Sequence, residues 1–116
     1  MKTFAAALMF GVALMSGAAF ADTMENTYAN TIVVTSESGA ETRYFFNQDG
    51  TFTGIAPGGS TMAGRWTVTG DQLCLIPPNG QAPSCTTVEA DKNVGDTWQQ
   101  TGSNGAPITV TLQAGR

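Results

Sequence analysis

The sequence predicts an all-β protein, in which an antiparallel meander of about eight short strands forms a small closed or partly open barrel. Three observations lead to this class. After residue 21 the chain is rich in Thr, Gly, Val and aromatic residues and poor in Lys, Glu and Leu, as strands are. Several segments alternate apolar and polar residues, and none repeats apolar residues at helical spacing. Turn-forming residues recur about every 8–12 residues. A β-sandwich is the alternative arrangement.

The first 21 residues have the pattern of a bacterial secretory signal peptide. Lys2 supplies the positive charge, residues 4–15 are apolar, and Ala19-Phe20-Ala21 is a small-x-small cleavage site. The apolar run is shorter than the ~20 residues that a spanning helix needs, so we expect cleavage after Ala21 and no stable membrane anchor. Residues 22–116 then form a single β-domain that is periplasmic or secreted.

The charge of this domain argues against two classes of partner. Residues 22–116 carry four basic residues against nine acidic ones, a net charge of −5. Nucleic acid and anionic lipid both require clustered Lys and Arg, and the domain has no such cluster.

The strands can be placed from the alternation and the turn residues between them. Residues 22–27 are expected to be a loose leader into the domain. Strands are then expected at residues 28–35, 42–47, 51–55, 62–69, 72–76, 84–89, 96–101 and 107–112.

The first informative turn is Gln48-Asp49-Gly50, which fits a three-residue loop with Gly50 in the left-handed conformation. This loop places Phe46 opposite Phe52 and Tyr44 opposite Gly54.

The second turn starts with Gly70 and fits a two-residue type II′ loop. Trp66 then faces Leu75 and Val68 faces Leu73, so that four apolar side chains share one face.

The last turn, Ser103-Asn104-Gly105, again fits a three-residue loop. It sets Trp98 opposite Val110. A two-residue Asn-Gly turn would move Trp98 to the other face of the sheet.

The two cysteines, Cys74 and Cys85, are predicted to form a disulfide. An exported chain matures in an oxidising compartment, the spacing is not that of a redox Cys-x-x-Cys motif, and two thiolates without histidine make a poor zinc site. Four residues separate each cysteine from Asn79-Gly80, so the pair would lie directly opposite across a hairpin. The register puts Cys74 on the face away from Leu73, so we expect the bridge on the outer face or at a rim.

The tip of this hairpin is rich in proline, which cannot donate to a strand ladder. We therefore expect an extended, partly unpaired loop projected by the disulfide. It is a candidate surface for contact with a partner, made up of Pro77, Pro78, Asn79, Gly80, Gln81 and Pro83.

Several catalytic chemistries are excluded by composition. The chain has no histidine, which removes the Ser-His-Asp triad, the Cys-His pair and imidazole metal ligands. Two calcium-like fragments, "NQDG" and "DKNVGD", lack the remaining oxygen ligands and are interpreted as turns. We expect no metal, no cofactor and no enzymatic activity. A small hydrolase that uses a carboxylate pair is the alternative.

The aromatic residues are the other candidates for a site. They either pack the barrel interior, which is the preferred interpretation, or line a cavity for a small apolar ligand. These residues are Tyr44, Phe46, Phe52, Trp66 and Trp98.

The pattern "DGTFTG…GRWTVTGDQLCL…C…VGDTW…TVTL" covers most of residues 22–116. It resembles small exported bacterial β-proteins of uncharacterised function, and more distantly periplasmic protease-inhibitor barrels and other lipocalin-like folds. The resemblance implies a non-catalytic binding module, inhibitor-like towards an envelope or secreted protein. Its partner would be a protein or a small apolar ligand. A structural or assembly role in the cell envelope is a further alternative.

Overall fold

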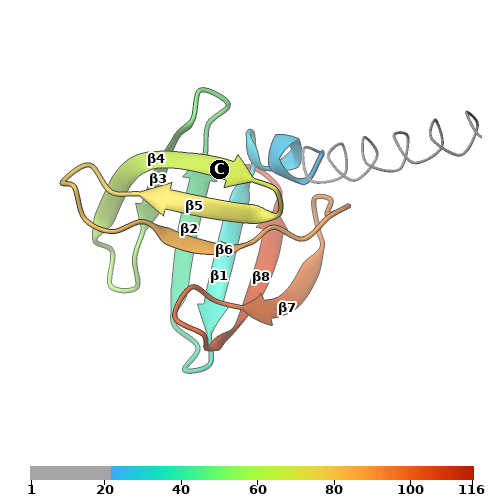
Figure 1. Ribbon diagram of the computed structural model, residues 1–116. Coiled ribbons are helices and arrows are strands. Elements are labelled where there is room, and N and C mark those ends of the chain that lie inside the picture. Colours follow the sequence, from blue (N-terminus) through green and yellow to red (C-terminus); the bar gives the residue numbers. More distant parts are fainter. Residues whose placement is uncertain (1–21) are drawn as a thin grey trace, which may run out of the picture.

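A computed structural model describes residues 22–116, and the predicted signal peptide and its cleavage site lie outside this range. All eight predicted strands are present, and they form one antiparallel sheet rolled into a nearly closed barrel (Figure 1). In chain order the strands are β1 (Thr31–Ser36), β2 (Glu41–Phe46), β3 (Thr51–Ile55), β4 (Thr61–Thr69), β5 (Gln72–Ile76), β6 (Ser84–Thr87), β7 (Thr97–Thr101) and β8 (Pro107–Gln113).

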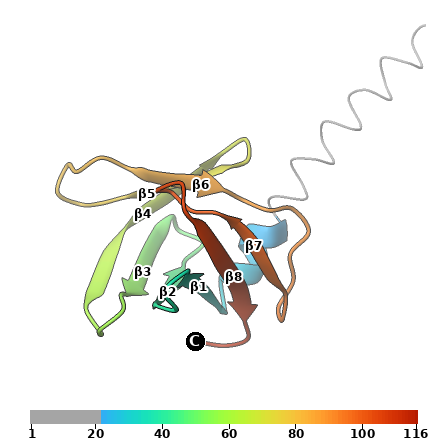
Figure 2. The same cartoon turned by 90° about the horizontal axis from the view of Figure 1, so that it is seen from below.

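The topology explains why the barrel has one open seam. Strands β1 to β6 form a simple meander, and the final hairpin then returns so that β8, not β7, pairs with β1. This leaves β6 and β7 as the two edges of the sheet. Seen from below, the strands curl around a common interior and bring these edges together (Figure 2). The barrel prediction is therefore confirmed in its partly open form.

The registers predicted from the three turns are confirmed. Phe46 lies opposite Phe52, Trp66 opposite Leu75, and Trp98 opposite Val110. Three other loops resemble the one that ends at Gly50. Each has three residues, ends in a glycine of positive φ and joins two neighbouring strands: residues 37–39, 57–59 and 103–105. Their closing bonds share one geometry, as in the loop where the amides of Asn47 and Gly50 bond to the carbonyls of Thr51 and Asn47.

Strand β4 makes the corner of the barrel. Its first half pairs with β3 and its second half with β5, and the exchange takes place at Arg65. Beside it, Gly64 lies under the ring of Phe52, and a Cβ there would be 2.5 Å from the carbonyl oxygen of Ile76. Glycine is needed here because another backbone approaches so closely.

The loose leader predicted at residues 22–27 is wrong. These residues form a short helix in which Met24 is buried. The Thr23 hydroxyl donates to the Glu89 carbonyl (2.8 Å) and accepts from the Lys92 amide (3.1 Å). The helix and the β6–β7 connection therefore close one end of the barrel together. The turn that follows the helix also delays the start of the first strand from residue 28 to Thr31.

Candidate ligand cavity

Inward-facing side chains, most of them apolar, line a partly open cavity of about 300 Å³ inside the barrel. Its walls come from β1, β2, β5, β6, β7 and β8, because alternate residues of each strand point into the barrel. Met24 of the helix and Val88 close one end. The aliphatic wall residues are Ile32, Val34, Leu73, Leu75, Ile108 and Val110.

The five aromatic residues predicted as one set occupy two environments. Tyr44, Phe46 and Trp98 line the cavity, whereas Phe52 and Trp66 do not. The latter two belong to an aromatic cluster made up of Tyr28, Tyr44, Phe46, Phe52 and Trp66, whose neighbouring ring centroids lie 6.0–6.2 Å apart. The aromatic cluster and the cavity therefore lie side by side in the barrel interior and share Tyr44 and Phe46.

The aromatic cluster is held in place by a hydrogen bond and by ring contacts. The indole Nε1 of Trp66 donates to the carbonyl of Asn47 at 2.9 Å, and the ring of Phe46 meets Trp66 edge to face. Phe46 and Phe52 are only 3% and 5% exposed. Phe52 and Trp66 therefore pack against other rings and do not line the cavity.

The cavity wall carries little charge. Among the described residues that line it, Glu89 is the one carboxylate. Burial raises the pKa of Tyr44 above its ordinary value of 10.0, so that the phenol stays neutral. Lys92 lies outside the wall, with its ammonium 5.1 Å from the centre of the Trp98 ring. An uncharged or weakly cationic molecule suits this surface better than an anion.

The seam between β6 and β7 borders the cavity and is bridged by side chains. The amide nitrogen of Gln100 donates to the Thr87 carbonyl (2.9 Å) and to the Thr86 hydroxyl (3.2 Å). The Thr86 hydroxyl in turn donates to the Thr101 carbonyl at 3.1 Å. The Gln100 oxygen accepts from the indole nitrogen of Trp98 at 2.6 Å, which ties a cavity-wall ring to the bridge.

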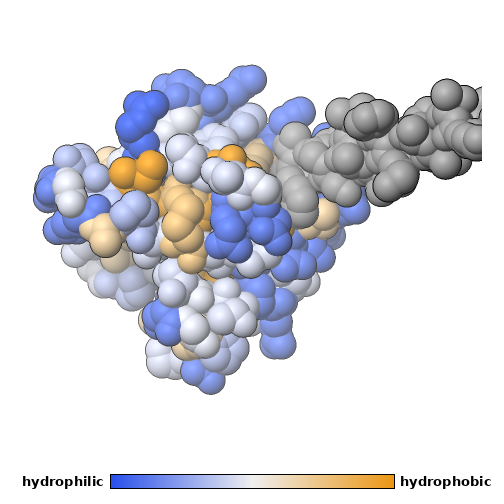
Figure 3. All heavy atoms as spheres, viewed as in Figure 1, coloured by the Kyte–Doolittle hydropathy of each residue, from blue (hydrophilic) through white to orange (hydrophobic). Residues whose placement is uncertain are grey.

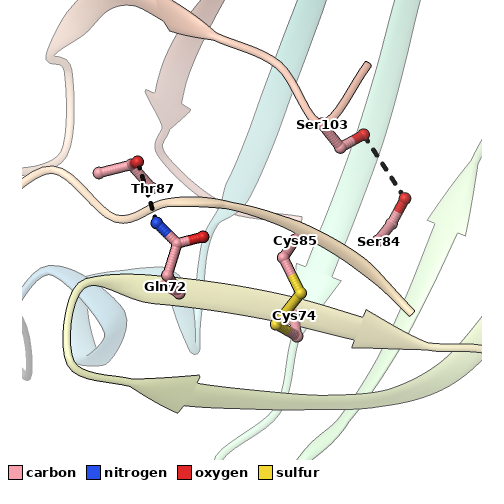
Figure 4. Close-up of a disulfide and its surroundings, with 6 residues drawn as sticks. All are labelled: Gln72, Cys74, Ser84, Cys85, Thr87 and Ser103. Carbon is pink, nitrogen blue, oxygen red and sulfur yellow. Dashed lines mark hydrogen bonds between the residues drawn. A yellow bond between two sulfur atoms is a disulfide. The ribbon is translucent and has the colours of Figure 1, made fainter. Parts of the chain in front are cut away.

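A further, longer contact joins the hydroxyls of Ser84 and Ser103 at 3.5 Å (Figure 4). Both residues line the cavity. The seam is therefore a row of polar side chains at the rim of an apolar space.

The predicted disulfide is confirmed, with Cys74 directly opposite Cys85 and a Cα–Cα distance of 4.1 Å. It lies on the outer face of the barrel and joins β5 to β6 (Figure 4). Pairing between β5 and β6 stops at Leu75 and Ser84, and the loop that follows Ile76 is unpaired as expected. Its residues from Pro78 to Pro83 are exposed.

The acidic side chains of the domain lie mainly in loops. Asp49 accepts hydrogen bonds from the hydroxyl and amide of Thr51 (2.6 and 3.0 Å), and Asp96 accepts one from the Asn93 amide. Within residues 22–116, no three His, Cys, Asp or Glu side chains gather in a metal-binding group. No helix in this part of the chain is long and apolar enough to cross a membrane.

The face seen in Figure 3 is mostly hydrophilic, with apolar residues in small areas. Among the described residues, the large apolar side chains that are exposed are Ile55 and Val94. The apolar material of this domain is therefore concentrated inside the barrel.

Comparison of the chain with protein-family models, with curated proteins and with solved structures finds no match. Sequence reasoning pointed to Tyr44, Phe46 and Trp98 but missed Thr86, Gln100 and the helix. A signal for Gln100 was present in the sequence, since it is polar at a position that shares the inward face of its strand with Trp98.

Proposed function

We propose that this protein is a non-catalytic binding module that holds one small, uncharged apolar molecule inside its barrel. The observation that carries this proposal is the cavity of about 300 Å³, with aliphatic and aromatic walls and a polar rim. Ligand sites in proteins share this design, in which apolar walls give affinity and a few polar groups orient the ligand. Barrels of about eight strands are wide enough to hold one small molecule.

The volume sets the size of the ligand. A cavity of about 150 Å³ binds a single benzene ring, so twice that volume suits a molecule of about two to three rings or a short alkyl chain. The charge of the wall sets its polarity, since Glu89 would repel an anion. A neutral hydrophobic molecule fits both criteria.

The location proposed for this binding is the periplasm or the extracellular space. The signal-peptide pattern of residues 1–21 and the disulfide both fit an oxidising compartment. A carrier or scavenger of apolar molecules has a use there, because such molecules cross aqueous spaces poorly when free.

The test uses two probes that differ in charge. Neutral N-phenyl-1-naphthylamine should bind and gain fluorescence, whereas its sulfonated analogue, 8-anilinonaphthalene-1-sulfonate, should bind weakly or not at all. Absence of saturable binding of the neutral probe would refute the proposal.

The two tryptophans then locate the bound molecule. A bromoalkane quenches indole fluorescence on contact. In the W66F variant the remaining Trp98 lies on the cavity wall and should be quenched strongly. In the matched W98F variant the remaining Trp66 lies in the aromatic cluster and should be quenched little. Equal quenching in both variants would place the molecule outside the cavity.

A second candidate function is contact with a protein through the loop from Pro77 to Pro83. The supporting observation is that the loop is unpaired, exposed from Pro78 onwards and held at its base by the disulfide. Replacement of residues 77–83 by a Gly-Ser loop of equal length should abolish such binding and leave probe binding intact. If a partner from an envelope extract is retained equally by both forms, the loop is not its site.

A further inference from the structure

The open seam has two edges that match each other. The amide of Val88 donates to the Asp71 carbonyl. Because the residues of an antiparallel strand alternate between its two neighbours in their backbone bonding, residues 84 and 86 also bond to β5. Cys85 and Thr87 then direct their backbone groups towards the seam. On the other side, Gly102 bonds to Ala106, so residues 99 and 101 direct theirs towards the seam.

The bridging side chains align these edges. Thr86 of β6 bonds to Thr101 of β7, and Thr87 bonds to Gln100. The residue numbers rise on one edge as they fall on the other, as expected for antiparallel neighbours. A register that pairs Thr87 with residue 99 and residue 85 with Thr101 would let the free backbone groups of the two edges bond to each other. The inward side chains of Thr86 and Gln100 would then share one face.

We propose that this seam is the route by which the ligand enters and leaves the cavity, and that Gln100 is its latch. The inference rests on the proposed function, because it concerns the same cavity. Elsewhere in the barrel wall, each neighbouring pair of strands within residues 22–116 is joined by a ladder of backbone bonds. At the seam, the bonds that must break within this part of the chain are the few made by side chains of Thr86, Gln100 and Ser84.

The latch is also placed to respond to the ligand. Gln100 and Thr86 line the cavity, and Gln100 accepts a hydrogen bond from the indole of Trp98 on the cavity wall. A molecule that packs against the Trp98 ring therefore contacts the direct hydrogen-bond partner of Gln100, the residue that bridges the seam. On the other side of β6, the disulfide fixes this strand to β5, so opening of the seam need not separate β6 from β5.

The experiment bridges the seam with a cross-link on the outer face. Thr87 bonds through its hydroxyl to Gln72 outside the barrel, and Gln99 is exposed, so a T87C/Q99C variant leaves the inward side chains of Thr86 and Gln100 unchanged. Dibromobimane, which joins two nearby thiols, is added without reductant so that the native disulfide stays intact. The matched control for the register is T87C/T97C, with the second cysteine two residues away on the same face of β7.

The measured quantities are the association and dissociation rates of N-phenyl-1-naphthylamine by stopped-flow fluorescence, before and after cross-linking. Cross-linking of T87C/Q99C should slow both rates by about tenfold while the Kd changes little, as for a gated site. The latch variant Q100L should speed both rates. The bimane bridge should form faster in T87C/Q99C than in T87C/T97C.

Unchanged association and dissociation rates in the cross-linked protein would show that the seam is not the route. Because the probe would still bind, the proposed function would stand. Equal bridging in the two cysteine variants would overturn the register. If the wild-type protein does not bind the probe, the proposed function fails and this inference fails with it.

Discussion

The two sides of the barrel interior are built from the same alternating strands and have opposite packing. On the side of β2, β3 and β4, the rings of Phe46, Phe52 and Trp66 pack against one another. On the side of β5, β6 and β7, the inward positions hold Leu73, Leu75, Thr86, Trp98 and Gln100, and a cavity remains. Strand alternation decides which residues face inward, and the volume of those residues decides whether the interior is filled.

The two sides also differ in how their strands are joined. The aromatic cluster lies behind backbone ladders, with β4 paired to β3 through its first half and to β5 through its second half. The cavity lies behind β6, a strand of four residues, and behind the seam. The packed rings and the proposed ligand cavity thus occupy different sides of one small barrel, and substitutions on the two sides should have different effects.

The largest expected effect comes from truncating the aromatic cluster. Phe52→Ala should lower the free energy of unfolding by about 3–5 kcal/mol, because it empties a packed site. Leu75→Ala on the cavity wall should cost less, about 2 kcal/mol, because part of its surface already faces empty space. Denaturant unfolding of the two variants measures both. A larger loss in L75A would contradict the division of the interior.

The disulfide should rank next. Removing it in C74S/C85S should cost about 3 kcal/mol, the chain-entropy value for a loop of this size. The loss should fall mainly on β6, which has only β5 as a backbone-bonded neighbour. Hydrogen exchange should therefore speed up at Thr86 and Val88 well before it does at Phe46. Uniform acceleration through the barrel would show that β6 does not open separately.

Enlarging a side chain should also affect the stability of the packed side more than that of the cavity side. Gly64→Ala should destabilise the fold by about 1–3 kcal/mol or more, because the new Cβ would lie 2.5 Å from the Ile76 carbonyl oxygen and 2.9 Å from the Phe52 ring. Val34→Phe projects into the cavity and should change stability little while it abolishes probe binding. Retained binding in V34F would mean that the probe occupies another site.

Much of the fold could be predicted from the sequence because its turns carry local signals. The glycine in each three-residue loop determined the pairing of Phe46 with Phe52 and of Trp98 with Val110. The symmetric spacing around Asn79-Gly80 likewise determined the cysteine pair. Register follows from a few turn residues, which a single sequence displays.

The cavity and its seam could not be predicted in this way. They depend on the return of β8 to β1, which leaves β7 beside β6, and no local pattern encodes that choice. The helix at residues 22–27 is too short to show a periodicity, and its role depends on distant partners at Glu89 and Lys92. The division of the five aromatic residues between cluster and cavity could not be predicted either. Whether a ring is packed or borders empty space depends on the side chains of strands that are far apart in sequence.

The smallest predicted effect compares the turns at the two sides of the barrel. In the β2–β3 loop, the side chain of Asp49 accepts a hydrogen bond from the amide of Thr51. In the β7–β8 loop, the side chain of Asn104 accepts the corresponding bond from Ala106, also at 3.0 Å. One loop is therefore closed by a carboxylate that titrates and the other by an amide that does not.

The hydrogen bonds from the side chain and amide of Thr51 hold the pKa of Asp49 below its ordinary value of 3.8. A carboxyl group whose pKa is lower in the folded state than in the unfolded state stabilises the fold at a pH above the unfolded-state pKa. That stabilisation is lost as the pH falls through the folded-state pKa. An NMR titration of Asp49 should therefore give a midpoint under 3.8, and Thr51→Val should raise it by removing the side-chain bond.

The matched loop shows how much of this shift the backbone bond supplies. Asn104→Asp should place a second low-titrating carboxylate in the β7–β8 loop, because the amide of Ala106 is positioned to donate to it. Ala106 has no hydroxyl, so the pKa of the introduced carboxylate should lie between that of Asp49 and the ordinary value of 3.8. A midpoint at 3.8 or above for the carboxylate introduced at position 104, with Asp49 still low, would show that the backbone bond common to both loops does not lower the pKa.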